Sequence, residues 1–239
     1  MKKLFTICLF INYFSHAGTF DNPKNLKVLD KNISPLELRN TMKNFALSLG
    51  VRCTHCHDGE ESQPFNTINF ASDKKQNKKT ARMMLKMIEK MNEKYISKIE
   101  NNSEIIECST CHRGQDKPRL TNNLLFKEYQ SNGVQASLDK YDVLKGKYFG
   151  SHTHDFSEKM LLDVASKVQV NSPESAMKIY LKNLEIFPKS QQTLFSIARF
   201  YHNQIQTKEA LSYYLKAQEI RSSPWLDKTI IELKNELKN

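Results

Sequence analysis

The sequence predicts an all-α protein. Seven glycines and seven prolines in 239 residues are too few for the many tight turns of a β-sandwich or β-barrel. Hydrophobic residues make up 39% and charged residues 26% of the chain, which argues against a mostly disordered protein. Apolar residues also recur at helical spacing in several segments. The length fits one large domain or two small ones.

The N-terminus has the pattern of a secretory signal peptide. Lys2 and Lys3 precede an apolar run over residues 4–14, and small residues then lead up to Ala17. The run is about half the roughly 20 residues that a membrane-spanning helix needs, so an uncleaved anchor is the weaker alternative. We therefore predict cleavage after Ala17, export to the periplasm, and at most a peripheral association with a membrane.

Two copies of a C-x-x-C-H motif dominate the chemistry of the chain. With Cys8 removed in the signal, the four remaining cysteines form two equally spaced pairs, and each pair is followed by histidine: Cys53-Thr54-His55-Cys56-His57 and Cys108-Ser109-Thr110-Cys111-His112. This spacing is that of c-type haem attachment, in which both sulfurs bond to the porphyrin and the histidine becomes the proximal iron ligand. The motifs predict two covalently bound haem c groups, held by Cys53, Cys56, His57, Cys108, Cys111 and His112.

Other uses of four cysteines explain less. Two disulfides in an exported protein, or one zinc ion held by four sulfurs, leave both histidines without a role. A thioredoxin-like dithiol requires a βαβ pattern that the sequence lacks. His55 occupies a variable position of the first motif, where its side chain is expected to point away from the iron.

A helix ahead of the first motif supplies a candidate for the sixth ligand of its iron. The segment Ser34-Pro35-Leu36-Glu37 combines a capping serine, a proline in the first turn and a glutamate, which predicts a helix start. Met42 lies on the apolar stripe of this helix, and Gly50 is expected to end it. Met42 is therefore the predicted axial ligand of the first haem.

A second helix is predicted over residues 77–99. Its apolar stripe consists of Met84, Met87, Ile88, Met91 and Tyr95, whereas Met83 lies off it. A methionine on such a stripe is by itself more often core filler than a ligand. Because the second haem also needs a sixth ligand, we predict Met84 in that role, with Met87 as the second candidate. Methionine opposite histidine suits electron transfer.

Three segments carry a family resemblance: Leu36-Glu37-Leu38-Arg39-Asn40-Thr41-Met42 leading into the first motif, Thr80-Ala81-Arg82-Met83-Met84-Leu85-Lys86-Met87, and Cys108-Ser109-Thr110-Cys111-His112-Arg113-Gly114. Together, over about residues 26–118, they resemble one two-haem half of the cytochrome c subunit of photosynthetic reaction centres. The resemblance implies that Met42 and Met84 are ligands. A second haem pair is missing, so photosynthesis is not implied. Shorter two-haem relatives suggest a periplasmic electron carrier of a non-phototroph.

The C-terminal half contains an internal repeat. Ala176, Tyr180, Leu181, Lys182 and Ile186 recur 34 residues later. Leu161, Val164 and Ala165 are matched 33 residues later by Leu194, Ile197 and Ala198. This period predicts tetratricopeptide-like repeats over about residues 157–222. Two units are few, so helices near residues 134–147 and 226–237, or the haem module, are expected to cap them. The repeats either dock a peptide or protein partner or form a plain helical spacer.

The charge of the chain limits its partners. The formal net charge of +10 includes two lysines of the signal, and the haem propionates lower it further, so nucleic acid is not an expected partner. Lys74, Lys75, Lys78 and Lys79 either steer an acidic redox partner or are only solvated. His152, His154 and His202 are interpreted as surface or packing residues.

Taken together, the sequence predicts three parts: a signal peptide over residues 1–17, a di-haem cytochrome c domain over 18–120 and a helical repeat domain over 121–239. The expected function is the transfer of single electrons between redox protein partners, without catalytic residues. Two alternatives stay open, a di-haem peroxidase-type enzyme and an assembly scaffold whose haems only stabilise the fold.

Overall fold

The computed structural model describes residues 19–101 and 104–238, and the regular elements in these ranges are helical. The prediction of a helical fold is confirmed; the β-structure within the described ranges is limited to an isolated bridge between Asp58 and Asn69. The predicted signal peptide lies outside the described residues. No helix in the described ranges is long and apolar enough to cross a membrane.

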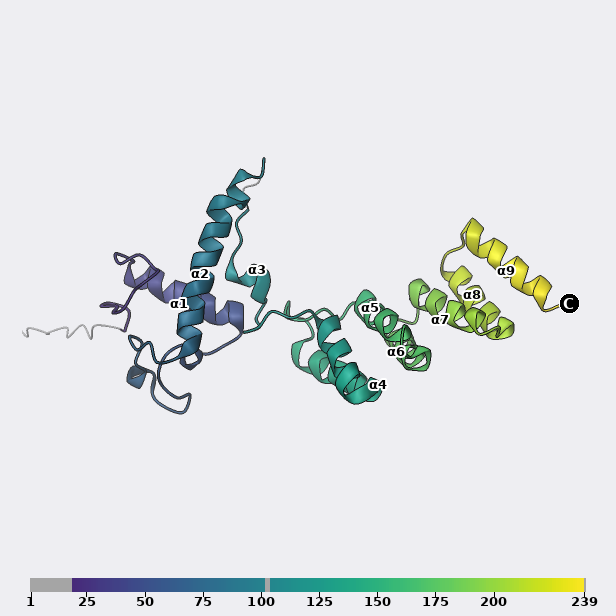
Figure 1. Cartoon of the computed structure of the whole chain (residues 1–239), viewed down its shortest axis with the longest axis horizontal. Coiled ribbons are helices and arrows are strands. Elements are labelled where there is room, and N and C mark those ends of the chain that lie inside the picture. Colours follow the sequence, from purple (N-terminus) through teal and green to yellow (C-terminus); the bar gives the residue numbers. More distant parts are fainter. Residues whose placement is uncertain (1–18, 102–103, 239) are drawn as a thin grey trace, which may run out of the picture. The chain divides into compact units, whose positions relative to one another are not determined.

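The chain divides into two compact units between Lys117 and Pro118, and each is described by itself. Within residues 19–101 and 104–117, the first unit contains three α-helices and three short 3₁₀ turns, coloured purple to teal in Figure 1. In chain order they are α1 (Pro35–Leu49), η1 (Cys53–His55), η2 (Phe65–Thr67), α2 (Gln76–Lys94), η3 (Ile96–Lys98) and α3 (Cys108–His112). Helix α1 packs against α3.

Helix α1 begins and ends where the sequence predicts. The Ser34 side chain accepts a hydrogen bond from the backbone N–H of Glu37, and Pro35 occupies the first turn. Gly50 takes a left-handed conformation with φ 65° and closes the helix. Because α1 stops there, the chain enters the first C-x-x-C-H motif within three residues.

The second predicted helix is shorter than expected. Helix α2 ends at Lys94, and the chain then tightens into the 3₁₀ turn η3, so the prediction of a helix to residue 99 is wrong at its C-terminal end. Tyr95 leaves the ideal helical conformation with φ −119°. The β-branched Ile96 and Ile99 that follow favour helix less than the Met- and Lys-rich part of α2.

The second unit is a series of helices in which each packs against the next. They are α4 (Thr121–Tyr148), α5 (Glu158–Gln169), α6 (Pro173–Ile186), α7 (Gln191–Asn203), α8 (Thr207–Ile220) and α9 (Pro224–Glu236). Helix α4 is broken at Gly133, which has φ 86°. The part of α4 before Gly133 was not predicted because its Asn and Ser residues are weak helix formers. Leu125, packed in the core of this unit, stabilises it there.

Several positions that are equivalent in the internal repeat are buried to the same extent. Val164 and Ala165 on α5 are fully buried, as are Ile197 and Ala198 on α7. The same holds for the pair Ala176 and Ala210, and the tyrosines Tyr180 and Tyr214 are nearly so, at 3% and 1% exposed. The corresponding side chains therefore have the same packing role in both copies.

This equivalence can be tested by overpacking. We expect Ala165→Leu and Ala198→Leu each to destabilise the second unit by about 1–3 kcal/mol, because neither site has room for a larger side chain. Urea unfolding followed by circular dichroism measures the effect. The exposed neighbour Ser166, changed to Leu, serves as the control and is expected to stay within about 0.5 kcal/mol. If one alanine substitution lowered the free energy of unfolding and the other did not, the two positions would not have equivalent packing.

Candidate haem-attachment sites

The first C-x-x-C-H motif forms a compact turn after α1. The backbone N–H groups of Cys56 and His57 both donate to the carbonyl of Cys53, at 3.2 and 2.9 Å. This turn places the two thiols three residues apart on one turn of chain and brings the histidine directly after it. Burial raises the pKa of the Cys56 thiol.

The loop that follows folds back onto His57. Asn69 donates from its backbone N–H to the carbonyl of Asp58 at 2.8 Å, and the Phe70 ring lies 4.9 Å from the His57 ring. His57 Nδ1 is 3.2 Å from the carbonyl oxygen of Phe70. Since a carbonyl oxygen only accepts, Nδ1 carries the proton in this bond and the lone pair of Nε2 is available for a metal.

Two lysines turn inward around the first motif. Lys75 donates to the carbonyls of Thr54 and Gly59, and Lys78 donates to the carbonyls of Phe70 and Ser72. Lys78 is buried, with 9% of its surface exposed. The expectation of a solvated or partner-steering cluster of four lysines is therefore wrong for Lys78, because the nearby carbonyls bind its ammonium group. Lys74 and Lys79 are exposed.

Asp73 joins the segment before α1 to the start of α2. Its carboxylate contacts Lys27 at 2.6 Å, Arg82 at 2.7 Å and Lys78 at 3.4 Å, and the Asn25 amide donates to it at 2.9 Å. The hydrogen bonds from Lys27, Asn25 and Arg82 hold the pKa of Asp73 well below its usual range. The residues around the first motif are thus held by one carboxylate shared among several cations.

The second motif lies on the short helix α3. The side chains of Glu107 and Thr110 cap its start reciprocally, and Arg113 ends it in a left-handed conformation. The Asn92 amide of α2 makes two hydrogen bonds to the backbone of Ile106, at 2.8 and 2.9 Å. Helix α2 thereby fixes the segment that enters the motif.

His112 repeats the arrangement of His57. Its Nδ1 lies 2.7 Å from the carbonyl oxygen of Gln115, so Nδ1 is the donor and Nε2 is available for a metal. Both motif histidines are therefore fixed in the same tautomer by a backbone carbonyl. This is the second-sphere hydrogen bond typical of metal-ligating histidines.

The two motifs are joined through a close backbone contact. Gly114, just after the second motif, donates its N–H to the carbonyl of Ser48 at 2.8 Å. A Cβ atom built on Gly50 would lie 2.1 Å from the carbonyl oxygen of Gly114, so only glycine fits at position 50. Cys53 is three residues from Gly50, and His112 is two residues from Gly114. Because consecutive Cα atoms are about 3.8 Å apart, the Cα atoms of Cys53 and His112 lie within about 25 Å of each other.

The donor sets fit haem c better than the alternatives. The four cysteines of the two motifs are free thiols in the structure. The described ranges contain no group of three or more His, Cys, Asp or Glu side chains placed to hold a metal ion, so the four sulfurs are not gathered into a zinc site. Each site instead offers two thiols and one oriented imidazole, which is the set that a thioether-bound, histidine-ligated haem requires.

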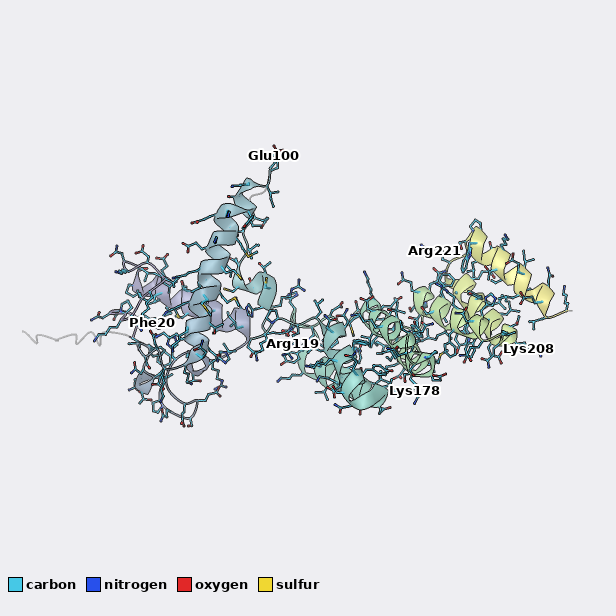
Figure 2. All side chains as sticks on the ribbon, viewed as in Figure 1. Phe20, Glu100, Arg119, Lys178, Lys208 and Arg221 are labelled. Atoms are coloured by element: carbon cyan, nitrogen blue, oxygen red, sulfur yellow. The ribbon has the colours of Figure 1, made fainter. Side chains whose placement is uncertain are left out.

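The candidate axial methionines lie on the two long helices of the first unit. Met42 is half-buried on α1, which leads into the first motif. Met84 and Met87 on α2 are 41% and 47% exposed. Figure 2 shows the side chains of this unit with sulfur in yellow. Apolar side chains on α2 are thus accessible for a haem face rather than buried in the protein.

The other histidines that the structure describes have no metal-ligand neighbourhood. His55 Nε2 lies 3.1 Å from the Asn77 amide. His154 packs against the Tyr148 ring and Nδ1 lies 3.3 Å from the Thr121 hydroxyl, and burial lowers its pKa. His152 and His202 are exposed.

Sequence reasoning missed three residues that shape the sites and misjudged the role of a fourth, Lys78. The carbonyls of Phe70 and Gln115 are backbone groups, which leave no trace in side-chain identity. Asn92 and Lys78 act through their side chains, but each forms its hydrogen bond with a backbone carbonyl that lies 8–14 residues away along the chain. The cluster of lysines was the one signal in the sequence that pointed to this region. The helical periodicity of apolar residues did not show that the Lys78 side chain turns inward.

Comparison with known proteins places the chain among c-type cytochromes. Residues 63–186, just over half the chain, match the family described as the photosynthetic reaction centre cytochrome C subunit. The match contains the second motif and continues into the second unit, whereas the first motif lies outside it; the expected range of 26–118 is thus only partly covered.

A curated relative points the same way. Cytochrome c-554 of Chloroflexus aurantiacus is 32% identical over 95 residues, which are 39% of this chain and 21% of that protein. The chain therefore spans about a fifth of the length of this relative. No solved structure matches the chain.

Proposed function

Because the chain belongs to the family of photosynthetic reaction centre cytochrome c subunits, we propose that it is a two-haem c-type cytochrome that passes single electrons between redox proteins. Covalently bound haem and electron transfer are what the family implies. The observation that carries the proposed number of haems is the repetition of one site: two C-x-x-C-H motifs, each with its histidine Nδ1 bonded to a backbone carbonyl.

The proposed roles follow from the donor sets. Cys53 and Cys56 hold the first haem and Cys108 and Cys111 the second, each through two thioether bonds. The Nε2 atoms of His57 and His112 are the proximal ligands. Met42 and Met84 are proposed as the sixth ligands, with Met87 as the alternative at the second site. When bound, each haem supplies a one-electron couple at its iron.

The arrangement of the chain supports electron passage between the sites. The backbone contact between Gly50 and Gly114 limits the distance between the two attachment sites. The apolar side chains of α2 would shield haem from water. Export to the periplasm, with the signal removed after Ala17, completes the proposal and provides the compartment in which redox proteins would meet this chain.

The second unit is proposed to dock a protein partner. The repeat-equivalent burial of α5 with α7 and of α6 with α8 supports tetratricopeptide-like stacking, which presents an extended surface. An electron donor held there would reduce the haems faster than one that only collides with the first unit.

The proposal is tested on the full chain matured with its signal in a host that attaches haem c. Intact mass is expected to show two haems per chain, and a redox titration two one-electron steps. Free thiols, disulfides or bound zinc would contradict it. A high-spin iron together with turnover of hydrogen peroxide would instead favour the peroxidase-type enzyme.

The axial ligands are tested separately. We expect Met42→Ala to convert one of the two irons from six-coordinate low-spin to high-spin, and Met84→Ala to convert the other, because each loses its thioether ligand. Electron paramagnetic resonance and the optical spectrum of the oxidised protein measure this. Met83→Ala, an exposed neighbour on the same helix, is the control and should change neither. An unchanged spectrum in Met84→Ala with a converted iron in Met87→Ala would move the assignment to Met87.

A further inference from the structure

We propose that Lys78 is a positioning residue that raises the reduction potential of the first haem above that of the second, because its buried ammonium group and the His57 imidazole share one backbone carbonyl. Electrons would then run from the second site to the first. This inference rests on the proposed two-haem function. It adds a direction of electron transfer between the two haems, which that function does not require.

The shared carbonyl is the geometric basis. Lys78 Nζ lies 2.7 Å from the Phe70 oxygen and 2.8 Å from the Ser72 oxygen. The same Phe70 oxygen accepts from His57 Nδ1 at 3.2 Å. Because Lys78 is charged and lies closer, its hydrogen bond to the Phe70 oxygen is stronger than that of His57. The bond from His57 is weakened accordingly.

The charges around His57 are predominantly positive. Lys75 binds the carbonyls of Thr54 and Gly59, within and just after the motif. Asp73 opposes these cations but is shared among Lys27, Lys78 and Arg82. The second nearby carboxylate, Asp58, faces Lys74 at 3.7 Å. Burial, followed by the charges of Lys78, Arg82 and Lys75, lowers the pKa of His57, which agrees with a positive field at the ring.

Two effects of Lys78 act in the same direction. A nearby cation disfavours the ferric state, which carries one more positive charge than the ferrous state. A weaker hydrogen bond from Nδ1 makes the imidazole a poorer donor to iron, which also disfavours the ferric state. Both raise the reduction potential of the first site.

The second site lacks this arrangement. His112 Nδ1 has the Gln115 carbonyl at 2.7 Å, which is a shorter bond than that of His57. The residue next to Cys108 is Glu107, whose carboxylate caps α3. Burial raises the pKa of the Cys108 thiol, and the charge of Glu107 adds to this rise. Among the described residues, no buried lysine binds the Gln115 carbonyl, because the only one, Lys78, lies at the first site. The second haem is therefore expected to have the lower potential.

The test is a spectroelectrochemical titration of the two-haem protein carrying Lys78→Gln. We expect one of the two potentials to fall and the other to stay at its wild-type value. Lys79→Gln is the matched control, since it removes the same charge from the next residue of α2, where the side chain is exposed and solvent screens it. The control should leave both potentials unchanged.

Each outcome is decisive. If Lys78→Gln matures with two haems and an unchanged ligand spectrum but shifts neither potential, shifts both equally or raises one, the inference fails while the proposed function stands. If the wild type carries fewer than two haems, both fail. Should Lys78→Gln not fold, Lys78→Met, which keeps the aliphatic stem and removes the same charge, takes its place in the titration, and the same outcomes decide.

Discussion

A chain in which Cys108 and Cys111 are both replaced by serine is expected to mature with one haem instead of two. Serine cannot form the thioether bonds, so covalent attachment at α3 is lost while the first motif keeps its two thiols and its oriented His57. The intact mass should fall by one haem, and the redox titration should show a single one-electron step.

The reciprocal variant is the control. Replacing Cys53 and Cys56 by serine should also leave one haem, and the remaining potential should be the lower of the two wild-type values. Replacing all four cysteines should leave none. The first motif matters most in this series because it lies outside the range that matches the family. Full haem loading after loss of either pair would show that the motif concerned does not attach haem.

The second large effect is expected from Gly50→Ala. Position 50 has φ 65°, where a side chain costs about 1–3 kcal/mol, and the added Cβ would lie 2.1 Å from the carbonyl oxygen of Gly114. The backbone on both sides must move apart, which breaks the hydrogen bond from Gly114 to Ser48. We expect the contact between α1 and the second motif to be destabilised by about 3 kcal/mol or more.

Hydrogen exchange reports on this contact directly. Exchange of the Gly114 amide should accelerate on the order of a hundredfold in Gly50→Ala. Gly146→Ala makes the same change in α4, where a Cβ meets nothing within 4 Å, and is expected to stabilise its helix by about 0.5–1 kcal/mol. Unchanged protection of Gly114 in Gly50→Ala would mean that the two motifs are not joined through this contact.

Local rules made parts of the fold predictable. The start of α1 at Ser34 and its end at Gly50 follow from capping chemistry within four residues of each boundary, and both are confirmed. The end of α2 and the first part of α4 were not predicted. In both segments the helix propensity differs little from one residue to the next. Tertiary packing and the turn next to the helix therefore decide where the helix ends or begins.

By itself, the sequence determined the helical class and the two C-x-x-C-H motifs, because helical periodicity and covalent spacing are properties of neighbouring residues. The tertiary structure decided which groups surround the motif histidines. The carbonyls of Phe70 and Gln115 reach His57 and His112 through backbone turns. Lys78 turns inward because the loop before α2 presents carbonyls to it, and such long-range placement leaves no pattern in the order of the amino acids.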